Sequence, residues 1–161
     1  MRHLTVLLVG IGLVLGLAGC SGGGSSGGSS ANKADRDITI EFRDAADTEH
    51  PGYLRTNLSG TARYLYVSQE VILGTDAVAR AEIDSTEGSS NRVTLYLTDD
   101  GREAFAEITR NRIGKRVGIM VDGLLLTAPL VMAEINSGRA VIEGRFDEHE
   151  AERIVRHLNA P

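Results

Sequence analysis

The chain has 161 residues, enough for one domain of modest size, and carries a formal net charge of −5 at pH 7. That acidic balance argues against a nucleic-acid partner and against a polybasic contact with anionic lipid. A single cysteine leaves no possibility of an internal disulfide or of a cysteine metal site.

Residues 1–19 have the composition of a signal peptide. They contain Arg2 and no acid, followed by the apolar run Leu4 to Leu15. This run is shorter than the about 20 residues that a stable transmembrane helix needs, but it suits the apolar core of a signal sequence. We therefore expect residues 1–19 to direct export.

The run closes on Leu17-Ala18-Gly19-Cys20, which resembles the bacterial lipobox. The resemblance implies cleavage between Gly19 and Cys20 and addition of lipid, palmitate included, to the Cys20 thiol. Paired acyl chains hold a protein stably on a membrane. We expect a lipoprotein on the cell membrane or the outer membrane, with its domain on the periplasmic, extracytoplasmic side. An ordinary secretory cleavage or an uncleaved anchor is the alternative.

A tether and an N-terminal segment precede the main domain. Residues 20–33 contain the lipidated cysteine and a Gly/Ser run, which behaves as a flexible coil. Residues 34–70 form an N-terminal part in which Ile38, Ile40 and Phe42 alternate as in a half-buried strand. Residues 44–60 show no periodicity and are predicted to be a loop, and residues 64–67 a second strand.

Residues 71–161 form the main domain, which begins with a predicted hairpin and a helix. Residues 78–84 and 92–97 alternate as strands, and the Gly/Ser-rich residues 85–91 are their mobile tip. A helix is predicted between residues 100 and 112, with Thr98 or Asp99 as its N-cap. Gly114 is expected to end this helix as its C′ residue.

The central feature of the domain is a second hairpin. Val117, Ile119 and Val121 alternate with less apolar neighbours, and Asp122-Gly123 follows at once. These two residues suit a type I′ turn, which requires positive φ at both positions. The chain then returns through residues 124–128 until Pro129, which has no N–H to donate to a ladder.

The C-terminal part completes a two-layer pattern. Residues 130–136 are ambiguous between a strand and one turn of helix, and residues 140–143 are a predicted strand. Asp147 and Glu150 have capping-box spacing ahead of a helix with an apolar stripe. The order of elements predicts an α+β fold with two helices on one face of a mainly antiparallel sheet.

Several motifs in residues 70–160 resemble the head of the first periplasmic region of SecD, a membrane subunit of the bacterial Sec preprotein translocase. The central one is D-G-x-x-x-[ST]-A-P, formed by Asp122, Gly123, Thr127, Ala128 and Pro129. The flanking motif positions are Gly101, Phe105, Thr109, Gly114, Lys115, Ile119, Ile135, Gly138, Ala140, Ile142, Gly144, Phe146, Glu150, Ala151 and Leu158. The resemblance implies a ferredoxin-like two-layer sandwich, in which Gly114, Lys115, Asp122, Gly123, Ala128, Pro129, Gly138 and Gly144 are structural.

No constellation of residues indicates catalysis, and we expect no cofactor or metal. The four histidines lack partners at ligand spacing, and Asp122 is better explained as a turn residue than as a general base. The glycines fall at predicted turns and strand ends rather than in a phosphate-binding loop.

Two hypotheses for function remain. The first is a non-enzymatic interaction module that contacts exported polypeptides, or envelope or translocase proteins, from the membrane surface. A sheet edge or the tip at residues 85–91 would offer backbone groups to such a chain. The second is a structural or scaffolding envelope lipoprotein unrelated to secretion, because fold alone does not fix function.

Overall fold

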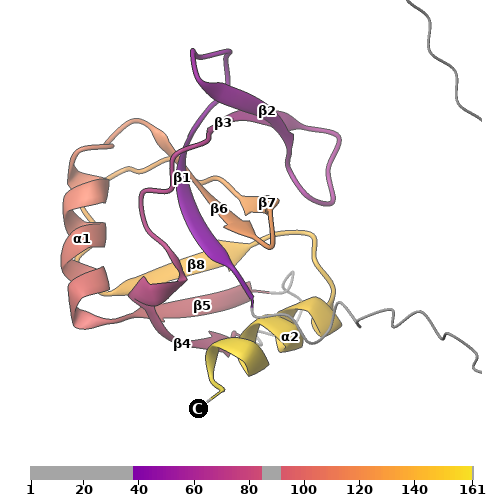
Figure 1. The fold of residues 1–161 in the computed structure, drawn as a ribbon, viewed down its shortest axis with the longest axis vertical. Coiled ribbons are helices and arrows are strands. Elements are labelled where there is room, and N and C mark those ends of the chain that lie inside the picture. The colour runs from indigo at the N-terminus through magenta and orange to yellow at the C-terminus, as the bar shows by residue number, and fades with distance from the viewer. Residues whose placement is uncertain (1–37, 85–91, 161) are drawn as a thin grey trace, which may run out of the picture. The chain divides into compact units, whose positions relative to one another are not determined.

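The computed structural model describes residues 38–84 and 92–160 (Figure 1). Two α-helices and two antiparallel sheets make this an α+β protein, as the sequence predicts. The strands are β1 (Ile40–Ala46), β2 (Tyr53–Asn57), β3 (Tyr64–Ser68), β4 (Val78–Ile83), β5 (Arg92–Leu97), β6 (Arg116–Val121), β7 (Leu124–Thr127) and β8 (Arg139–Glu143), and the helices are α1 (Asp99–Arg110) and α2 (Glu148–Leu158).

The larger sheet has the strand order β2-β3-β1-β6-β7. Its β6–β7 hairpin turns at Asp122 and Gly123, whose φ values of 49° and 79° are positive, as the predicted two-residue turn requires. Val117, Ile119 and Val121 of β6 are buried in the main core. The predicted central hairpin is therefore confirmed.

This sheet curls until its two edges meet. Leu58, directly after β2, pairs in parallel with Leu125 of β7, and the Ser59 N–H donates to the Leu125 carbonyl at 2.8 Å. The meeting of the edges pairs backbone groups that an open sheet would leave bare. The enclosed side contains a small second core formed by Ala45, Leu65, Val67, Leu125 and Ala128.

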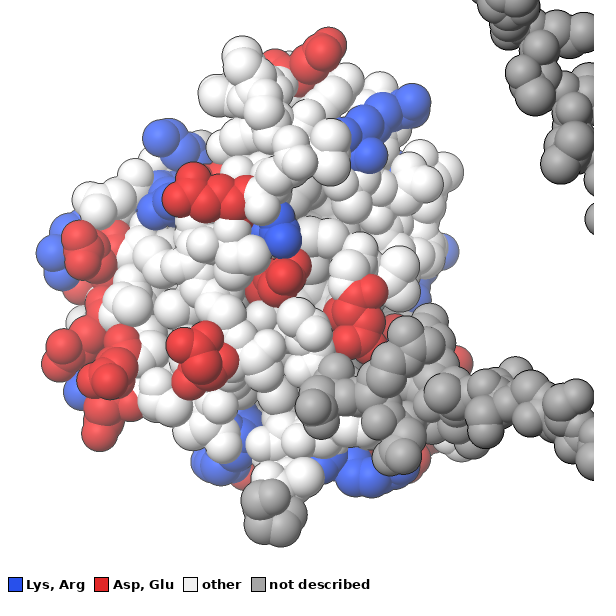
Figure 2. All heavy atoms as spheres, viewed as in Figure 1, with Lys and Arg blue, Asp and Glu red and all other residues white. Residues whose placement is uncertain are grey.

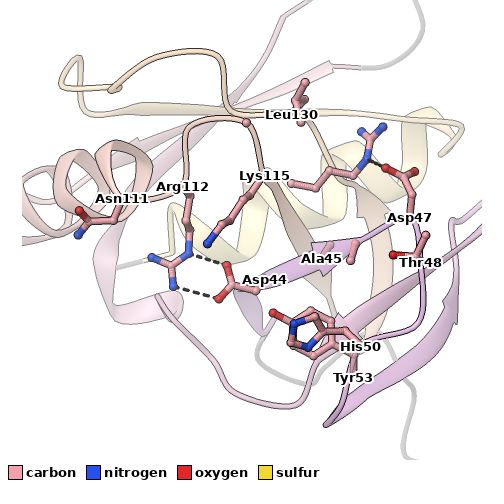
Figure 3. Close-up of a pocket in the computed structure, with 13 residues that line it drawn as sticks. Asp44, Ala45, Asp47, Thr48, His50, Tyr53, Asn111, Arg112, Lys115 and Leu130 are labelled. Atoms are coloured by element: carbon pink, nitrogen blue, oxygen red, sulfur yellow. Dashed lines mark hydrogen bonds and ion pairs between the residues drawn. The ribbon is translucent and has the colours of Figure 1, made fainter.

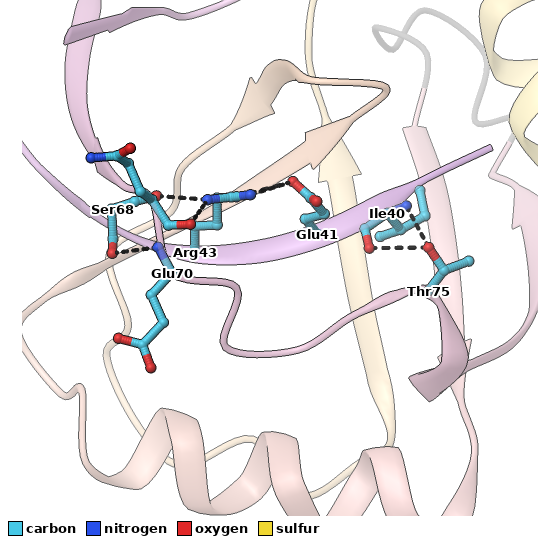
Figure 4. Close-up of polar contacts among 7 residues, drawn as sticks. Ile40, Glu41, Arg43, Ser68, Glu70 and Thr75 are labelled. Carbon is cyan, nitrogen blue, oxygen red and sulfur yellow. Dashed lines mark hydrogen bonds and ion pairs between the residues drawn. The ribbon is translucent and has the colours of Figure 1, made fainter. Parts of the chain in front are cut away.

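β1 lies in the middle of the larger sheet and has partners along both of its edges (Figure 4). β6 covers one edge, while β3 reaches only the end of the other. Nearer the start of β1, residues 72 and 73 take the place of β3: the Phe42 N–H donates to the Leu73 carbonyl at 2.8 Å, and the Phe42 carbonyl accepts from the Ile72 N–H at 2.9 Å. The Thr75 hydroxyl then accepts from the Ile40 N–H at 2.7 Å and donates to the Ile40 carbonyl at 3.2 Å.

The Arg43 side chain fastens β1 to the chain that follows β3. Its guanidinium donates to the carbonyl of Ser68 at 3.0 Å and to the carbonyl of Gln69, and it also pairs with Glu41 (Figure 4). These contacts satisfy carbonyls in a stretch where β1 and β3 no longer pair.

The smaller sheet has the order β4-β5-β8, and one of its faces is buried. Phe105 of α1 and Ala151 and Ile154 of α2 share a core with Phe42 of β1, which meets Phe105 edge-on at 5.4 Å between ring centroids. Both helices therefore contribute to the core beneath this sheet. The buried residues of the sheet are Ala81, Val93, Leu95, Ala140 and Ile142.

The strands are divided between two sheets rather than gathered in one. The central β6–β7 hairpin pairs with β1, not with β5 or β8, so the ferredoxin-like arrangement is not confirmed. The N-terminal strands β1 and β3 instead extend the sheet of the hairpin on its β6 side.

Three local predictions differ from the structure. Residues 44–60 are not one loop, since β1 extends to Ala46 and the exposed strand β2 follows. Residues 130–136 form neither a helix nor a named strand, although Val131 exchanges backbone hydrogen bonds with Gly114 and Lys115. Gly114 is not the C′ residue of α1, because the helix ends at Arg110 with its C-cap at Asn111. Its φ of 80° belongs to the turn that follows.

The N-caps of both helices agree with the sequence. The Thr98 hydroxyl accepts a hydrogen bond from the Gly101 N–H at 3.0 Å. The Asp147 carboxylate accepts from the Glu150 N–H at 2.8 Å. These bonds satisfy donors that the first turn of a helix leaves unpaired.

Candidate functional site

β8 has one open edge. Within the described residues, β5 is the only strand that pairs with β8. The Leu97 N–H donates to the Gly138 carbonyl at 2.9 Å, and successive residues of a strand direct their backbone groups to alternate sides. The N–H and carbonyl groups of Arg139, Val141 and Glu143 therefore point away from β5, and the side chains of these three residues are exposed.

Two glycines of the recognised motif lie on either side of this strand. Gly138 has a φ of 69°, and a Cβ there would lie 3.1 Å from the side chain of Arg102. A Cβ on Gly144 would approach the Leu126 carbonyl oxygen to 2.9 Å. A larger residue at Gly138 would press on the Arg102 side chain and be strained by the positive φ, whereas one at Gly144 would clash with the backbone of β7.

The opposite edge of the same sheet is capped at Ala81. The side-chain amide of Asn159, at the end of α2, accepts from the Ala81 N–H at 2.8 Å and donates to the Ala81 carbonyl at 2.9 Å. The amide thus reproduces the hydrogen bonds of a neighbouring strand on β4. Proteins commonly cover sheet edges in such ways. The uncovered edge of β8 is therefore a candidate for binding another strand.

An apolar groove of about 510 Å³ runs beside β8. Its walls come from β8, from α1, from β6 with the end of β7, and from the segment after β7, here called the groove segment (residues 129–135), and Phe42 of β1 also lines it. Met132 is 78% exposed, Leu130 45% and Val141 38%, although all three are apolar. Exposed apolar side chains that gather at one place commonly mark a contact surface.

The groove segment is held by α1. The Thr109 side chain is fully buried, and its hydroxyl accepts from the Ile135 N–H at 2.9 Å while it lies 2.8 Å from the Phe105 carbonyl, to which it can donate. Arg110 makes a two-pronged ion pair with Glu134 at 2.9 and 3.0 Å. The hydrogen bonds from this guanidinium lower the pKa of Glu134.

A second, polar cavity of about 540 Å³ lies near the other end of the groove segment (Figure 3). In it Arg112 forms a two-pronged ion pair with Asp44 at 2.5 and 3.0 Å. Arg116 pairs with Asp47 at 2.8 Å, and Lys115 also lines the cavity. Because these arginines are already neutralised by aspartates, the cavity is better explained by the joining of β1 to the α1–β6 connection than by ligand binding.

Asp122 is a junction between three parts of the domain. Its carboxylate accepts from the Thr39 N–H at 3.0 Å and from Arg153 of α2 at 2.7 Å. Its own N–H donates to the Thr39 carbonyl at 3.0 Å. These contacts join the start of β1, the β6–β7 turn and α2, and they account for the residue without a role as a general base.

Of the remaining motif residues, Ala128 belongs to the second core, Pro129 lines the groove and Lys115 lines the polar cavity. Ala128 is buried, and its carbonyl accepts from Arg116 at 3.0 Å. Pro129 lines the groove, and its carbonyl accepts from the Val117 N–H at 3.2 Å. The structure therefore brings Pro129 and Gly138 toward one site, while Asp122 and Gly123 lie at the opposite end of β6.

Several predicted features lie outside the described residues: the signal peptide, the Gly19–Cys20 cleavage site, the tether and the hairpin tip at residues 85–91. In the part of the chain that the structure does describe, no His, Cys, Asp or Glu side chains gather as a metal site would require. None of the helices described there is long and apolar enough to cross a membrane.

Charge is mixed on the face shown in Figure 2. Acidic side chains gather over α1, whose first turn contains Asp99 and Asp100, and basic side chains lie singly or beside acids. The described residues on this face therefore present no broad basic patch.

The sequence does not predict the contacts of two polar residues, Asn159 at the edge of β4 and Thr109 beneath the groove segment. Asn159 was not singled out, because an amide near the end of a helix is ordinary. Thr109 was noticed only as a motif position; its place on the apolar side of α1, one turn after Phe105, could have indicated a buried hydroxyl.

Fold and site together define a small α+β domain whose described residues form two antiparallel sheets, with the open edge of β8 beside an apolar groove. The family model described as the P1 head subdomain of SecDF matches residues 52–161, and the chain belongs to this family.

Similar proteins agree with that assignment. SecD of Rickettsia conorii is 33% identical over 104 residues, which are 65% of this chain and 20% of that protein. SecDF of Thermus thermophilus is 41% identical over 85 residues, which are 52% of this chain and 11% of that protein. The chain thus spans about a fifth or less of the length of these relatives.

Solved structures of SecDF have a similar fold. The structure of SecDF described as a membrane component that enhances protein export has a TM-score of 0.60 and 26% identity, over 76% of this chain and 62% of that one. SecDF in its super-membrane-facing form has a TM-score of 0.61 and 27% identity, over 76% of this chain and 18% of that one.

Proposed function

We propose that this protein is a membrane-anchored lipoprotein of the cell envelope that binds extended polypeptides, in association with protein export. The proposal extends to this chain the association with protein translocation and export that the names of its SecD and SecDF relatives state. It assigns no enzymatic activity: the domain would act by holding chains or envelope and translocase proteins.

The observation that carries the proposal is the open edge of β8 beside an apolar groove. An extended chain can add to such an edge as a further strand, with its backbone paired to Arg139, Val141 and Glu143. Backbone pairing does not depend on sequence, as a protein that meets many exported chains requires.

The groove would accept the side chains of that strand. Alternate residues of an added strand would project toward Met132 and Leu130. Methionine is unbranched and flexible, so it adapts to apolar side chains of different shapes. An asymmetric sheet, closed at Ala81 by Asn159 and open at β8, would direct binding to one side.

Anchoring is proposed to occur through Cys20, after cleavage behind Gly19. This would hold the domain at the periplasmic side of the cell membrane or at the outer membrane. Mass spectrometry of the protein purified from membranes is expected to find acyl chains at Cys20, and Cys20→Ala should release the protein from membranes. A free thiol at that position would contradict the anchor but not the binding site.

A proline on the open edge tests the binding site. The N–H of Val141 points away from β5, so Val141→Pro removes a donor from the open edge without breaking the β5–β8 ladder. Binding of a fluorescently labelled, permanently unfolded polypeptide should fall about tenfold or more. Val141→Thr, which keeps the N–H and the branched side chain, is the matched control. Equal binding by both variants would contradict the proposal.

Crosslinking in cells tests the link to export. A photoreactive side chain at Met132, in the groove, should capture exported polypeptides, whereas one at the exposed Leu54 of β2 should not. If gene deletion leaves export of a reporter unchanged and Met132 captures only resident envelope proteins, the scaffolding alternative is correct.

A further inference from the structure

The open edge of β8 carries an ordered pattern of charge. Its outward residues are Arg139, Val141 and Glu143, so a basic side chain, an apolar one and an acidic one follow each other on the exposed face of the strand. Val141 is at the centre. If the strand is turned end to end about Val141, Arg139 and Glu143 exchange positions.

We propose that the β8 edges of two copies of this chain pair antiparallel about Val141. In that register Arg139 lies opposite Glu143 of the second copy, Val141 lies opposite its counterpart, and Glu143 lies opposite the other Arg139. Each of these residues directs its backbone groups outward, so the contact forms about six backbone hydrogen bonds. The two smaller sheets become one continuous six-stranded sheet.

Charge selects this register over the others. A parallel pairing in register would place Arg139 against Arg139 and Glu143 against Glu143, and opposed like charges on neighbouring strands are destabilising. An antiparallel pairing shifted by two residues would place Val141 against a charge and lose one residue pair. The antiparallel register centred on Val141 is the one in which every outward side chain has a suitable partner.

The groove gives the contact an apolar component. In an antiparallel pair the two-fold axis runs perpendicular to the sheet, so surfaces that lie beneath each edge approach each other. Met132 and Leu130, which line the groove beside β8, would then be covered by the second copy. The contact is short, which predicts a weak, concentration-dependent dimer.

Charge reversal provides the test. Sedimentation equilibrium of the full chain, in reducing buffer with mild detergent, should show a monomer–dimer mixture. Arg139→Glu and Glu143→Arg should each lower the association constant about tenfold or more, because each places two pairs of like charges across the contact. An equimolar mixture of these two variants, and the double variant R139E/E143R, should recover dimerisation.

The controls separate association from folding. Glu143 also pairs with Arg92 within the sheet, so thermal unfolding is measured for every variant. Arg80→Glu is the matched control, because it reverses a charge on the exposed face of β4, far from the β8 edge. This variant should leave the dimer intact. A monomeric wild-type chain, or single variants that dimerise as well as the wild type, would overturn the proposal.

This contact goes beyond the proposed function but uses the same edge, so a bound polypeptide and the second copy would compete. Binding of the labelled unfolded polypeptide is therefore measured on the same variants. Polypeptide binding without any dimer would remove the present inference and leave the proposed function standing. A dimer that binds no polypeptide would support the present inference and contradict the proposed function.

Discussion

Asn159 caps the backbone of β4 from the end of α2. Its amide meets both backbone groups of Ala81, a residue with no exposed surface. Asn159→Ala should lower the free energy of unfolding by about 1–3 kcal/mol, because a buried N–H and carbonyl lose their partners. Urea unfolding would measure this. Asn111→Ala is the control, since Asn111 also caps a helix end but its cap contacts are made by its backbone N–H.

Asp122 combines an unfavourable backbone conformation with favourable contacts. Asp122→Ala should destabilise the domain by about 1–2 kcal/mol, because it removes the bonds to Thr39 and Arg153 and places alanine at positive φ. Asp122→Gly loses the same bonds but relieves the backbone, so comparing the two variants in urea isolates the conformational cost. Equal stability of the wild type and both variants would show that the junction contributes nothing.

Sequence reasoning succeeded at residues whose role is set by the local backbone. Asp122 and Gly123 were recognisable because a two-residue turn accepts few residue types, and Thr98 and Asp147 because helix starts need an acceptor. Asn159 was not predictable, since its partner Ala81 lies 78 residues earlier in the chain. Which edge of the sheet is open depends on that distant contact.

At the scale of elements, one buried hydroxyl holds the C-terminal end of the groove segment. Thr109→Val keeps the shape of the side chain but leaves the Ile135 N–H without its acceptor. Stability should fall by about 1–3 kcal/mol, and amide hydrogen exchange at Ile135 should accelerate. Thr109→Ser, which keeps the hydroxyl, should retain protection at Ile135. Unchanged exchange in the valine variant would contradict this account of the groove.

The Arg110–Glu134 pair makes the hold on this segment pH-dependent. The folded protein lowers the pKa of Glu134 from its ordinary value of 4.5, so the pair stabilises the segment above that pH and is lost as the pH falls through the lowered pKa. NMR titration should show the shifts of the groove segment changing with Glu134, below pH 4.5. In Arg110→Gln, the Glu134 titration should move upward toward its ordinary value.

The elements that the sequence predicted best direct a regular row of apolar residues toward the main core. β5, β6, α1 and α2 show clear alternation or a helical stripe because they cover the core. β2 was missed because its side chains are exposed or half-buried on both faces, which gives no period-two pattern. The groove segment has no regular pairing and was ambiguous for that reason.

At the scale of the whole molecule, the N-terminal strands are part of the fold rather than an addition to it. β1 lies between β3 and β6, and Phe42 is fully buried against Phe105. A chain that begins at residue 34 should therefore fold, whereas one that begins at residue 71 should not, because it lacks the central strand. Circular dichroism and the dispersion of amide resonances would decide, and a folded shorter chain would contradict this prediction.

The division of the strands between two sheets could not be predicted from the sequence, because it depends on contacts between distant parts of the chain. Periodicity shows that Ile40 and Phe42 face a core, but not which strands β1 will join. The pairing of β1 with β6 depends on contacts such as Ile40 with Val121, far apart in the chain. The resemblance to SecD identified the family from residues 70–160, whereas the sheet of its central hairpin is completed by earlier residues.

The position of β1 also has a kinetic consequence. Its main partner strand begins only at Arg116, so a long stretch of chain must close before the two can pair. Non-local strand pairing of this kind slows folding to about the millisecond-to-second range. During that interval Ile40 and Phe42 would be exposed on an unpaired strand, so the partly folded chain would be prone to aggregate.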